Sequence, residues 1–464
     1  MLLFMHSTGG SQTPFPERYN IVSIVTDDQA RWAAGPYNNQ EITTPHMDQL
    51  AREGALFQNA FVATPVCSPS RASFLTGVYP SRLGIGDWIA PVESDAGLGI
   101  PPSSLTWPEV LQKNGYATAL FGKWHLGTKP QFHPTRQGFD HFFGFLGGGN
   151  RPMDPVLEVK GETRQLDGPL PDLLVSDALR FIESNQNRPF AVLLHFRAPH
   201  LPFGPVPAQD SAPFQNLDPS VPEEPGIDVG QVKDWTRDYY ASIHSIDRNI
   251  GRLLEKLDDL DLSQNTIVLF TSDHGYMIGH HTVHSKGNSF WIAGGVRGPK
   301  RPNMYEHSIR VPLIIRWPQV IEPNTTIDQP VSNIDIFSSV LGMLDVPLPE
   351  IAKVDGKDFS PLLRGESIVW SDTLYGQYDL HNSGLAFLRM IRTQKWKLVR
   401  HYYTNFLDEL YNLTDDPEER TNLYRRVDHR EVRRHLQYRL LEWQRSIDDP
   451  LLQGLPPVAP QIEK

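Results

Sequence analysis

The sequence contains a single cysteine, Cys67, among 464 residues. An intrachain disulfide is therefore excluded, and cysteine usage gives no information about the redox compartment. Basic residues are also scarce, because 43 Lys and Arg face 54 Asp and Glu, which leaves a net charge of −11. Nucleic-acid binding requires a basic surplus, so we expect no nucleic-acid partner. A locally basic site could still bind an anion.

Long apolar runs are missing as well. None approaches the roughly 18 residues of a membrane-spanning helix, so we expect no membrane partner. The first residues, 1–7, lack the basic and apolar parts of a secretory signal. We therefore expect a cytoplasmic protein as the sequence is written, and a periplasmic or secreted one if the true start lies upstream. A chain of 464 residues is too long for one ordinary hydrophobic core, which predicts two domains or a large domain with an appendage.

Four short apolar stretches are typical of buried strands, at 20–26, 117–121, 190–196 and 266–271. Each is followed by charged residues or histidines. These are Asp27 and Asp28, Lys123 and His125, His200, and Asp273 and His274. The segments between them are helical or long enough for crossovers. This order predicts a doubly wound, mostly parallel sheet between helices. Such sheets bind ligands at the carboxyl ends of their strands, so these residues are expected to share one site.

Cys67 lies in the stretch 64–77, Thr-Pro-Val-Cys-Ser-Pro-Ser-Arg-Ala-Ser-Phe-Leu-Thr-Gly. Pro69 suits the first turn of a helix, so we expect Cys67 at or just before a helix N-terminus, where backbone N–H groups favour an anion. On its own, a lone cysteine is more often a small buried hydrophobe. The adjacent carboxylates of Asp27 and Asp28 would be costly after a buried strand without a cation, so a metal is their natural explanation. A solvated turn is the alternative.

Several of these segments resemble one family. Cys67-Ser-Pro-Ser-Arg71, with the Ala-Ser-Phe-Leu-Thr-Gly that follows, resembles the signature of the type I, formylglycine-dependent sulfatases of the alkaline-phosphatase-like superfamily. Gly122-Lys-Trp-His-Leu-Gly127, Ala198-Pro-His-Leu-Pro202, Ser272-Asp-His-Gly275 and the segment 409–423 are similar to further family segments. The resemblance implies an alkaline-phosphatase-like α/β fold with a smaller C-terminal α+β subdomain that contains an antiparallel sheet. We place the catalytic domain at 1–365 and the subdomain at 366–464.

The resemblance also implies a mechanism. A formylglycine-generating or equivalent maturation enzyme would oxidise Cys67 to formylglycine, whose hydrated form attacks sulfur. Arg71, Lys123 and Lys286 would neutralise the sulfate oxygens. His200, with Lys286, would protonate the departing alcohol, and His125 would remove a proton so that sulfate leaves. One divalent cation would be held by Asp27, Asp28, residue 67, Asp273 and His274.

Some assignments stay open at this point. Calcium is the expected cation, but many relatives have asparagine where this chain has His274, and the softer imidazole leaves manganese or zinc open. Lys300 is the alternative to Lys286 as the catalytic lysine. The expected substrate contacts are Asn150, Arg151, Arg197 and Lys300.

The expected function is hydrolysis of a sulfuric ester, most readily that of a sulfated carbohydrate or another small sulfated molecule. A phosphonate monoester or phosphodiester hydrolase of the same superfamily is the alternative enzyme. An inactive binding protein on the same scaffold would show a broken constellation, whereas here every expected position is filled.

Overall fold

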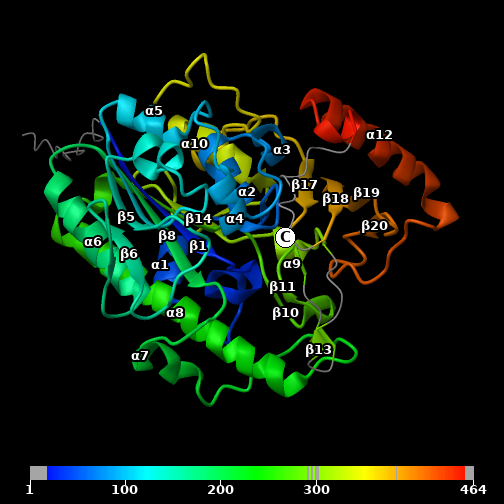
Figure 1. Ribbon diagram of the computed structural model, residues 1–464, viewed down its shortest axis with the longest axis horizontal. Helices are drawn as coiled ribbons and strands as arrows, with labels where there is room; N and C mark the ends of the chain where they lie inside the picture. The colour runs from blue at the N-terminus through cyan, green and yellow to red at the C-terminus, as the bar shows by residue number, and fades with distance from the viewer. Residues whose placement is uncertain (1–17, 290–291, 294–295, 298–301, 383, 455–464) are drawn as a thin grey trace, which may run out of the picture.

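A computed structural model describes residues 18–289, 292–293, 296–297, 302–382 and 384–454 (Figure 1). Its centre is a ten-stranded sheet with the order β15-β2-β14-β9-β1-β8-β4-β5-β6-β7. The four predicted strands are confirmed as β1 (Asn20–Asp27), β4 (Ala117–Lys123), β8 (Phe190–Pro199) and β9 (Thr266–Ser272). With β5 (His141–Phe145) they form a run of five parallel neighbours, so the predicted mostly parallel sheet is confirmed.

Antiparallel pairing occurs toward the edges of this sheet. β14 (Leu313–Arg316) runs antiparallel to both β9 and β2 (Ala55–Phe57), and β15 (Thr325–Ile327) closes that side. At the other edge, β6 (Val156–Val159) and β7 (Glu162–Gln165) form a hairpin against β5.

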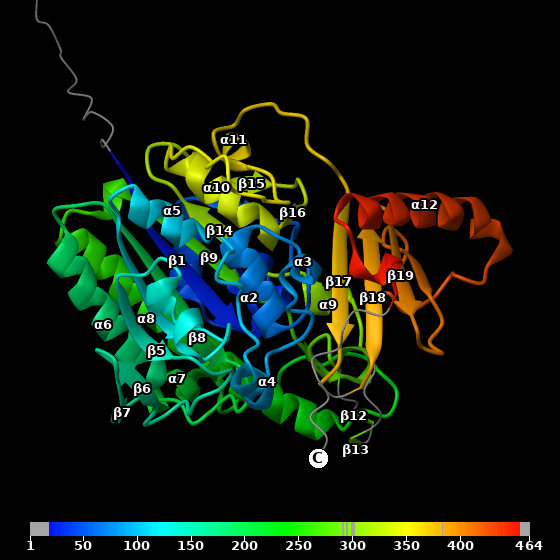
Figure 2. The ribbon, with the colours of Figure 1, turned by 45° about the horizontal axis from the view of Figure 1, so that its top comes forward.

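Helices cover both faces of the sheet, as Figure 2 shows. Alternate residues of β1 point to opposite faces, so Ile21 packs into one hydrophobic core while Val22 packs into the other. The first core lies under α2 (Cys67–Thr76), α5 (Trp107–Lys113) and α10 (Ile336–Met343). The second lies under α1 (Pro45–Arg52), α6 (Leu170–Asn185) and α8 (Val229–Asp259).

Helix α8 begins at Val229, before the apolar residues at helical spacing over 240–257, which are all buried. Asp228 caps it, because its carboxylate accepts a hydrogen bond from the backbone N–H of Gln231 at 3.0 Å. The apolar spacing continues into the first turns of α8, because Val232 and Tyr239 lie seven residues apart and are both buried.

A smaller antiparallel sheet of four strands lies beside the main body (Figure 2). Its strands are β17 (Leu374–Leu380), β18 (Ala386–Arg392), β19 (Trp396–Tyr402) and β20 (Glu409–Asn412). Helix α12 (Arg430–Ser446) packs on it through Leu436, Leu440 and Trp443. Leu441 is only half-buried, whereas Gln444 is buried. This arrangement confirms the predicted C-terminal α+β unit, while the boundary at residue 365 stays a prediction.

Candidate active site

Cys67 is the first residue of α2, directly after the extended Val66, as its sequence context predicts. The thiol is buried, yet its neighbours are charged rather than apolar. Sγ lies 3.1 Å from Nζ of Lys286 and 3.4 Å from Nε2 of His274. It also lies 3.6 Å from Oδ1 of Asp27. The surroundings of this cysteine are therefore those of a reactive group.

Three buried ion pairs surround the thiol. Lys123 contacts Asp27 at 2.6 Å, and Lys286 contacts Asp28 at 2.6 Å. Arg71 contacts Asp273 at 2.9 Å through both Nε and Nη2. Three cations balance three carboxylates, so the loss of any one member would leave an uncompensated buried charge.

The electrostatic environment favours an anion at position 67. Burial raises the pKa of the Cys67 thiol, but Lys123 and Lys286 together bring it well below its ordinary value. Burial likewise raises the pKa of Asp27, and Lys123 and His200 more than offset that effect. Burial and repulsion from Asp27 raise the pKa of Asp273 to about 7. A further cation between these carboxylates would relieve that repulsion.

The donor atoms for such a cation are already gathered. Ligand atoms of Asp27, Asp28, Cys67 and His274 all lie within 4.8 Å of one another, and no second group of this kind occurs in the described residues. Oδ1 of Asp273 lies beside them, 3.5 Å from Nε2 of His274, while its Oδ2 is held by Arg71. Carboxylates with one imidazole suit a divalent cation.

Asp28 adopts a backbone conformation that non-glycine residues rarely use, with φ of 71°. Its N–H donates to Oδ1 of Asp273 at 3.1 Å, and its carbonyl accepts a hydrogen bond from the hydroxyl of Tyr239. These bonds hold the strained residue so that its carboxylate faces the thiol. Strain of this kind is typical of functional sites.

Two histidines complete the site. Nε2 of His200 lies 3.9 Å from Oδ2 of Asp28, while its Nδ1 contacts the carbonyl of Leu201 at 2.7 Å. Nε2 of His125 contacts the carbonyl of Ile89 at 3.2 Å. Because a carbonyl only accepts, we infer that each contacting nitrogen carries the proton. The neutral rings then present a free lone pair on Nε2 of His200 and on Nδ1 of His125.

The predicted substrate contacts lie in different settings. Asn150 donates to the carbonyl of Val156 at 2.7 Å and accepts from the N–H of Arg151, so its amide shapes a loop. Arg151 is exposed. Arg197 is buried and donates to the carbonyls of Leu201 and Pro202, which anchors the loop that carries His200. Lys300 lies outside the described residues. The four substrate roles stay predictions.

Sequence reasoning missed two buried supports of the site. Nδ1 of His195 lies 3.3 Å from Nη1 of Arg71, and Asn333 donates to the carbonyl of Ser70 at 3.0 Å. His195 is the polar residue inside the otherwise apolar stretch 190–196, and that interruption was an available signal. Asn333 begins a short helical turn (Asn333–Asp335), and nothing in the local sequence indicates that its amide reaches α2.

A buried thiol among ion-paired carboxylates, at the carboxyl ends of parallel strands, defines a hydrolase centre on an alkaline-phosphatase-like fold. The chain belongs to the sulfatase family, because the family model described as Sulfatase matches residues 19–346. A second model, described as the C-terminal part of N-sulphoglucosamine sulphohydrolase, matches residues 299–446. The protein is therefore a sulfuric ester hydrolase, as its sequence motifs predict.

Individual relatives support this assignment. Human steryl-sulfatase is 30% identical over 75% of this chain and 70% of its own length. The N-acetylglucosamine-6-O-sulfatase of Bacteroides thetaiotaomicron is 26% identical over 96% of this chain and 90% of its own. A solved structure described as a complex with its substrate D-glucosamine-2-N,6-O-disulfate has a TM-score of 0.81 at 25% identity, covering 93% and 99% of the two chains.

One similar structure bears on the alternative function. The phosphonate monoester hydrolase of Agrobacterium radiobacter has a TM-score of 0.73 at 20% identity and covers 93% of this chain and 96% of its own. That similarity shows a common fold. Among the described helices, none combines the length and apolar character needed to cross a membrane.

Proposed function

We propose that this chain is a formylglycine-dependent sulfatase that releases sulfate from a sulfated carbohydrate. The observation that carries the proposal is the position of Cys67, whose Sγ lies 3.1 Å from Lys286 and beside the carboxylates of Asp27 and Asp28. A saccharide substrate is supported by the relatives named for N-acetylglucosamine and glucosamine sulfates.

The proposal requires two groups that are typical of the family. A maturation enzyme would oxidise Cys67 to formylglycine, and a divalent cation would be held by Asp27, Asp28, residue 67 and His274, with Asp273 alongside. Bound there, the cation supplies positive charge for a sulfate oxygen, and formylglycine supplies a nucleophilic hydroxyl. Calcium is our expectation for the ion, and manganese and zinc are the alternatives.

The residues of the chain then divide the remaining work. Lys123 and Lys286 hold positive charge next to residue 67, where negative charge increases in the transition state. Arg71 contributes less directly, because its Nε and Nη2 contact Asp273 and its Nη1 contacts His195. Its principal effect is to fix that carboxylate at the edge of the cation site.

His200 and His125 carry out the proton transfers. An alcohol leaves as a neutral molecule only if its oxygen gains a proton, so a general acid is needed. Nε2 of His200, which faces Asp28, takes up a proton and delivers it to the leaving oxygen. His125 has its Nε2 engaged by Ile89, so its Nδ1 is the basic atom that removes a proton from the group at position 67.

Sulfate release measured by ion chromatography tests the proposal. The protein would be co-expressed with a formylglycine-generating enzyme and offered sulfated mono- and oligosaccharides, a steryl sulfate and an aryl phosphonate. We expect sulfate from a saccharide and little turnover of the phosphonate. Phosphonate cleavage without sulfate release would instead assign the chain to the phosphonate hydrolases. The mass of the Cys67 peptide establishes in each preparation that the residue was converted.

A further inference from the structure

A cavity of about 680 Å³ lies beside α9 (Glu306–Ile309), and Glu306 and His307 of that helix line it. Its walls include Arg31 and Tyr37 from the segment after β1, His280, and Arg310 from the end of α9. None of the residues assigned above to the catalytic centre lines it. We refer to it as the Arg31–Arg310 cavity.

One wall of this cavity includes Glu306, which belongs to a buried charge cluster. Glu306 contacts Arg392 at 2.9 Å and Lys397 at 3.1 Å, and Lys397 also contacts Glu419 at 2.6 Å. Two carboxylates are thus matched by two cations. Arg31 and Arg310 add two further positive charges, and neither forms an ion pair with a carboxylate in the described part of the chain.

Among the described residues, these two guanidinium groups donate hydrogen bonds only to neutral acceptors. Arg31 donates from Nη2 to the side-chain oxygen of Gln58 at 2.6 Å. Arg310 donates from Nη2 to the backbone carbonyl of Gln58 at 2.6 Å and to the side chain of Asn59 at 2.9 Å. Nε of each arginine is buried without a hydrogen-bond partner among the described residues. Much of the donor capacity of both side chains is therefore unused.

The two arginines also repel each other. Burial and the positive charge of Arg31 together lower the pKa of Arg310 to about 10, although Glu306 acts in the opposite direction. Placing like charges together away from water is costly unless an anion compensates them. The cavity between them provides the space for one.

We propose that the Arg31–Arg310 cavity binds a sulfate-type oxyanion at a site separate from the catalytic centre. Guanidinium groups bind tetrahedral oxyanions through paired N–H donors, and two of them can clamp one anion. The ring of Tyr37 lies 4.4 Å from Cζ of Arg31 and holds that side chain in place. His280 adds a ring nitrogen, Nδ1, that is buried without a partner among the described residues.

The site is directly connected to the catalytic loops. Arg31 follows Asp28 by three residues, which span at most about 11 Å even when fully extended. Trp32, the next residue, donates from Nε1 to the carbonyl of Tyr276 at 2.9 Å, two residues after His274. The anion is either free sulfate, which the proposed reaction releases, or a second sulfate group on the saccharide.

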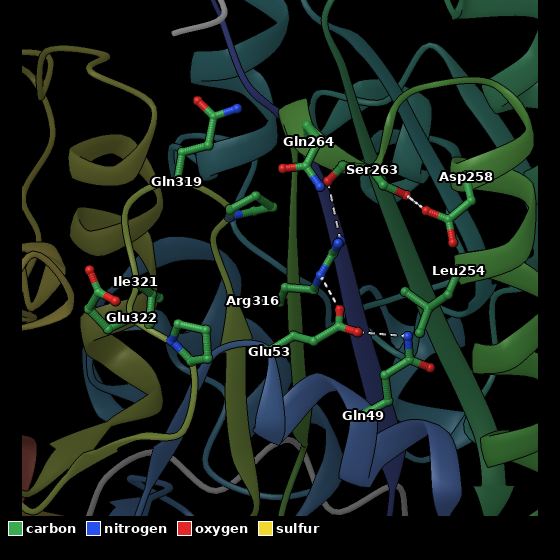
Figure 3. Close-up of a pocket in the computed structure, with 12 residues that line it drawn as sticks. Gln49, Glu53, Leu254, Asp258, Ser263, Gln264, Arg316, Gln319, Ile321 and Glu322 are labelled. Carbon is green, nitrogen blue, oxygen red and sulfur yellow. Dashed lines mark hydrogen bonds and ion pairs between the residues drawn. The ribbon is translucent and has the colours of Figure 1, made fainter. Parts of the chain in front are cut away.

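A different cavity provides the matched control. It has a volume of about 520 Å³, lies near the amino end of β9 and is lined by Arg316 (Figure 3). Here the guanidinium is compensated, because Arg316 contacts Glu53 at 2.7 Å and the carbonyl of Ser263 at 3.3 Å. The charge of Arg316 is therefore compensated without a bound anion.

Equilibrium dialysis with radiolabelled sulfate at constant ionic strength tests the proposal without relying on turnover. We expect Arg31→Met to weaken binding of one sulfate per chain by about tenfold, since it removes a charged donor. Arg316→Met should bind sulfate as the wild type does. Equal sulfate binding by wild type and Arg31→Met would overturn the proposal. Circular dichroism and the unfolding midpoint in chloride monitor the fold of each variant.

A measurement on the unaltered protein covers the case in which Arg31→Met does not fold. Crystals of the wild type containing selenate should show an anomalous peak between Arg31 and Arg310. A peak confined to the catalytic centre would contradict the site.

Kinetic measurements then distinguish free sulfate from a sulfate group of the substrate as the bound anion. This comparison rests on the proposed function. If the anion belongs to the substrate, Arg31→Met raises KM for a disulfated saccharide and leaves that of the monosulfated one unchanged. If the anion is free sulfate, both KM values stay unchanged and only sulfate binding in dialysis is weakened.

Discussion

Nζ of Lys286 lies 2.6 Å from Oδ1 of Asp28, although 258 residues separate the two in sequence. The same nitrogen lies 3.1 Å from Sγ of Cys67, so one lysine connects an acidic residue at the end of β1 with the thiol at the start of α2. This contact places Lys286 in the site, whereas Lys300 lies outside the described residues. It also makes the choice between the two lysines accessible to mutation.

Lys286→Met should lower kcat for sulfate ester hydrolysis by about 100- to 1,000-fold, the usual loss when one charged transition-state donor is removed. Lys300→Met is the comparison, and we expect its effect on kcat to be much smaller. Steady-state kinetics on the best saccharide measure both. A larger loss in the Lys300 variant would exchange the assignments.

Cys67→Ala should abolish turnover and leave the fold intact. The side chain is small and buried, so its removal opens little space, while no other residue can supply a formylglycine nucleophile. Sulfate release and circular dichroism are the two readouts. Ordinary activity in this variant would refute the mechanism.

His274→Asn should shift the bound metal toward calcium. An amide oxygen is a harder ligand than an imidazole nitrogen, and calcium prefers oxygen ligands. Mass spectrometry of the metals retained after dialysis against equal calcium, manganese and zinc compares the variant with the wild type. An unchanged metal ratio would show that residue 274 does not determine selectivity.

Lys397→Met should destabilise the attachment of the C-terminal unit. Lys397 is fully buried between Glu306 and Glu419. Its removal leaves Glu419 without a cation, while Glu306 keeps Arg392, and the expected cost is about 3–5 kcal/mol. Urea unfolding measures the loss. Arg445→Met breaks an exposed pair with Glu442 and serves as the control, with little expected change.

Asp247 should make stability depend on pH. Its carboxylate is buried and accepts N–H bonds from His46 and Met47, and burial raises its pKa to about 7. A carboxyl whose pKa is higher in the folded state favours folding when protonated. That contribution is complete at low pH, falls as pH rises above the unfolded value near 4, and is lost above pH 7.

Between pH 5 and pH 8 the free energy of unfolding should fall by about 2–3 kcal/mol through this one group. Asp247→Asn removes the titration and should flatten the profile by that amount. Urea unfolding of both proteins at the two pH values gives the difference, and other titrating groups cancel in it. Parallel profiles would show that Asp247 stays ionised in the folded protein.

The central strands could be predicted from the sequence, because a parallel strand buried on both faces must be apolar along its length. That pattern can be seen within a few consecutive residues. β1, β4, β8 and β9 all have it. β2 and β15 have three residues each, too few for a pattern, and both lie in the sheet only because neighbouring segments pair with them.

The residue types of the site, and their places after apolar strands, were determined by the sequence alone. Tertiary structure decided which charges pair, because Lys123 with Asp27, Arg71 with Asp273 and Lys286 with Asp28 are long-range contacts. It also left Arg31 and Arg310 without an ion-paired carboxylate in the described part of the chain. Ion pairing depends on a few ångströms between side chains of distant segments, and no local pattern encodes that distance.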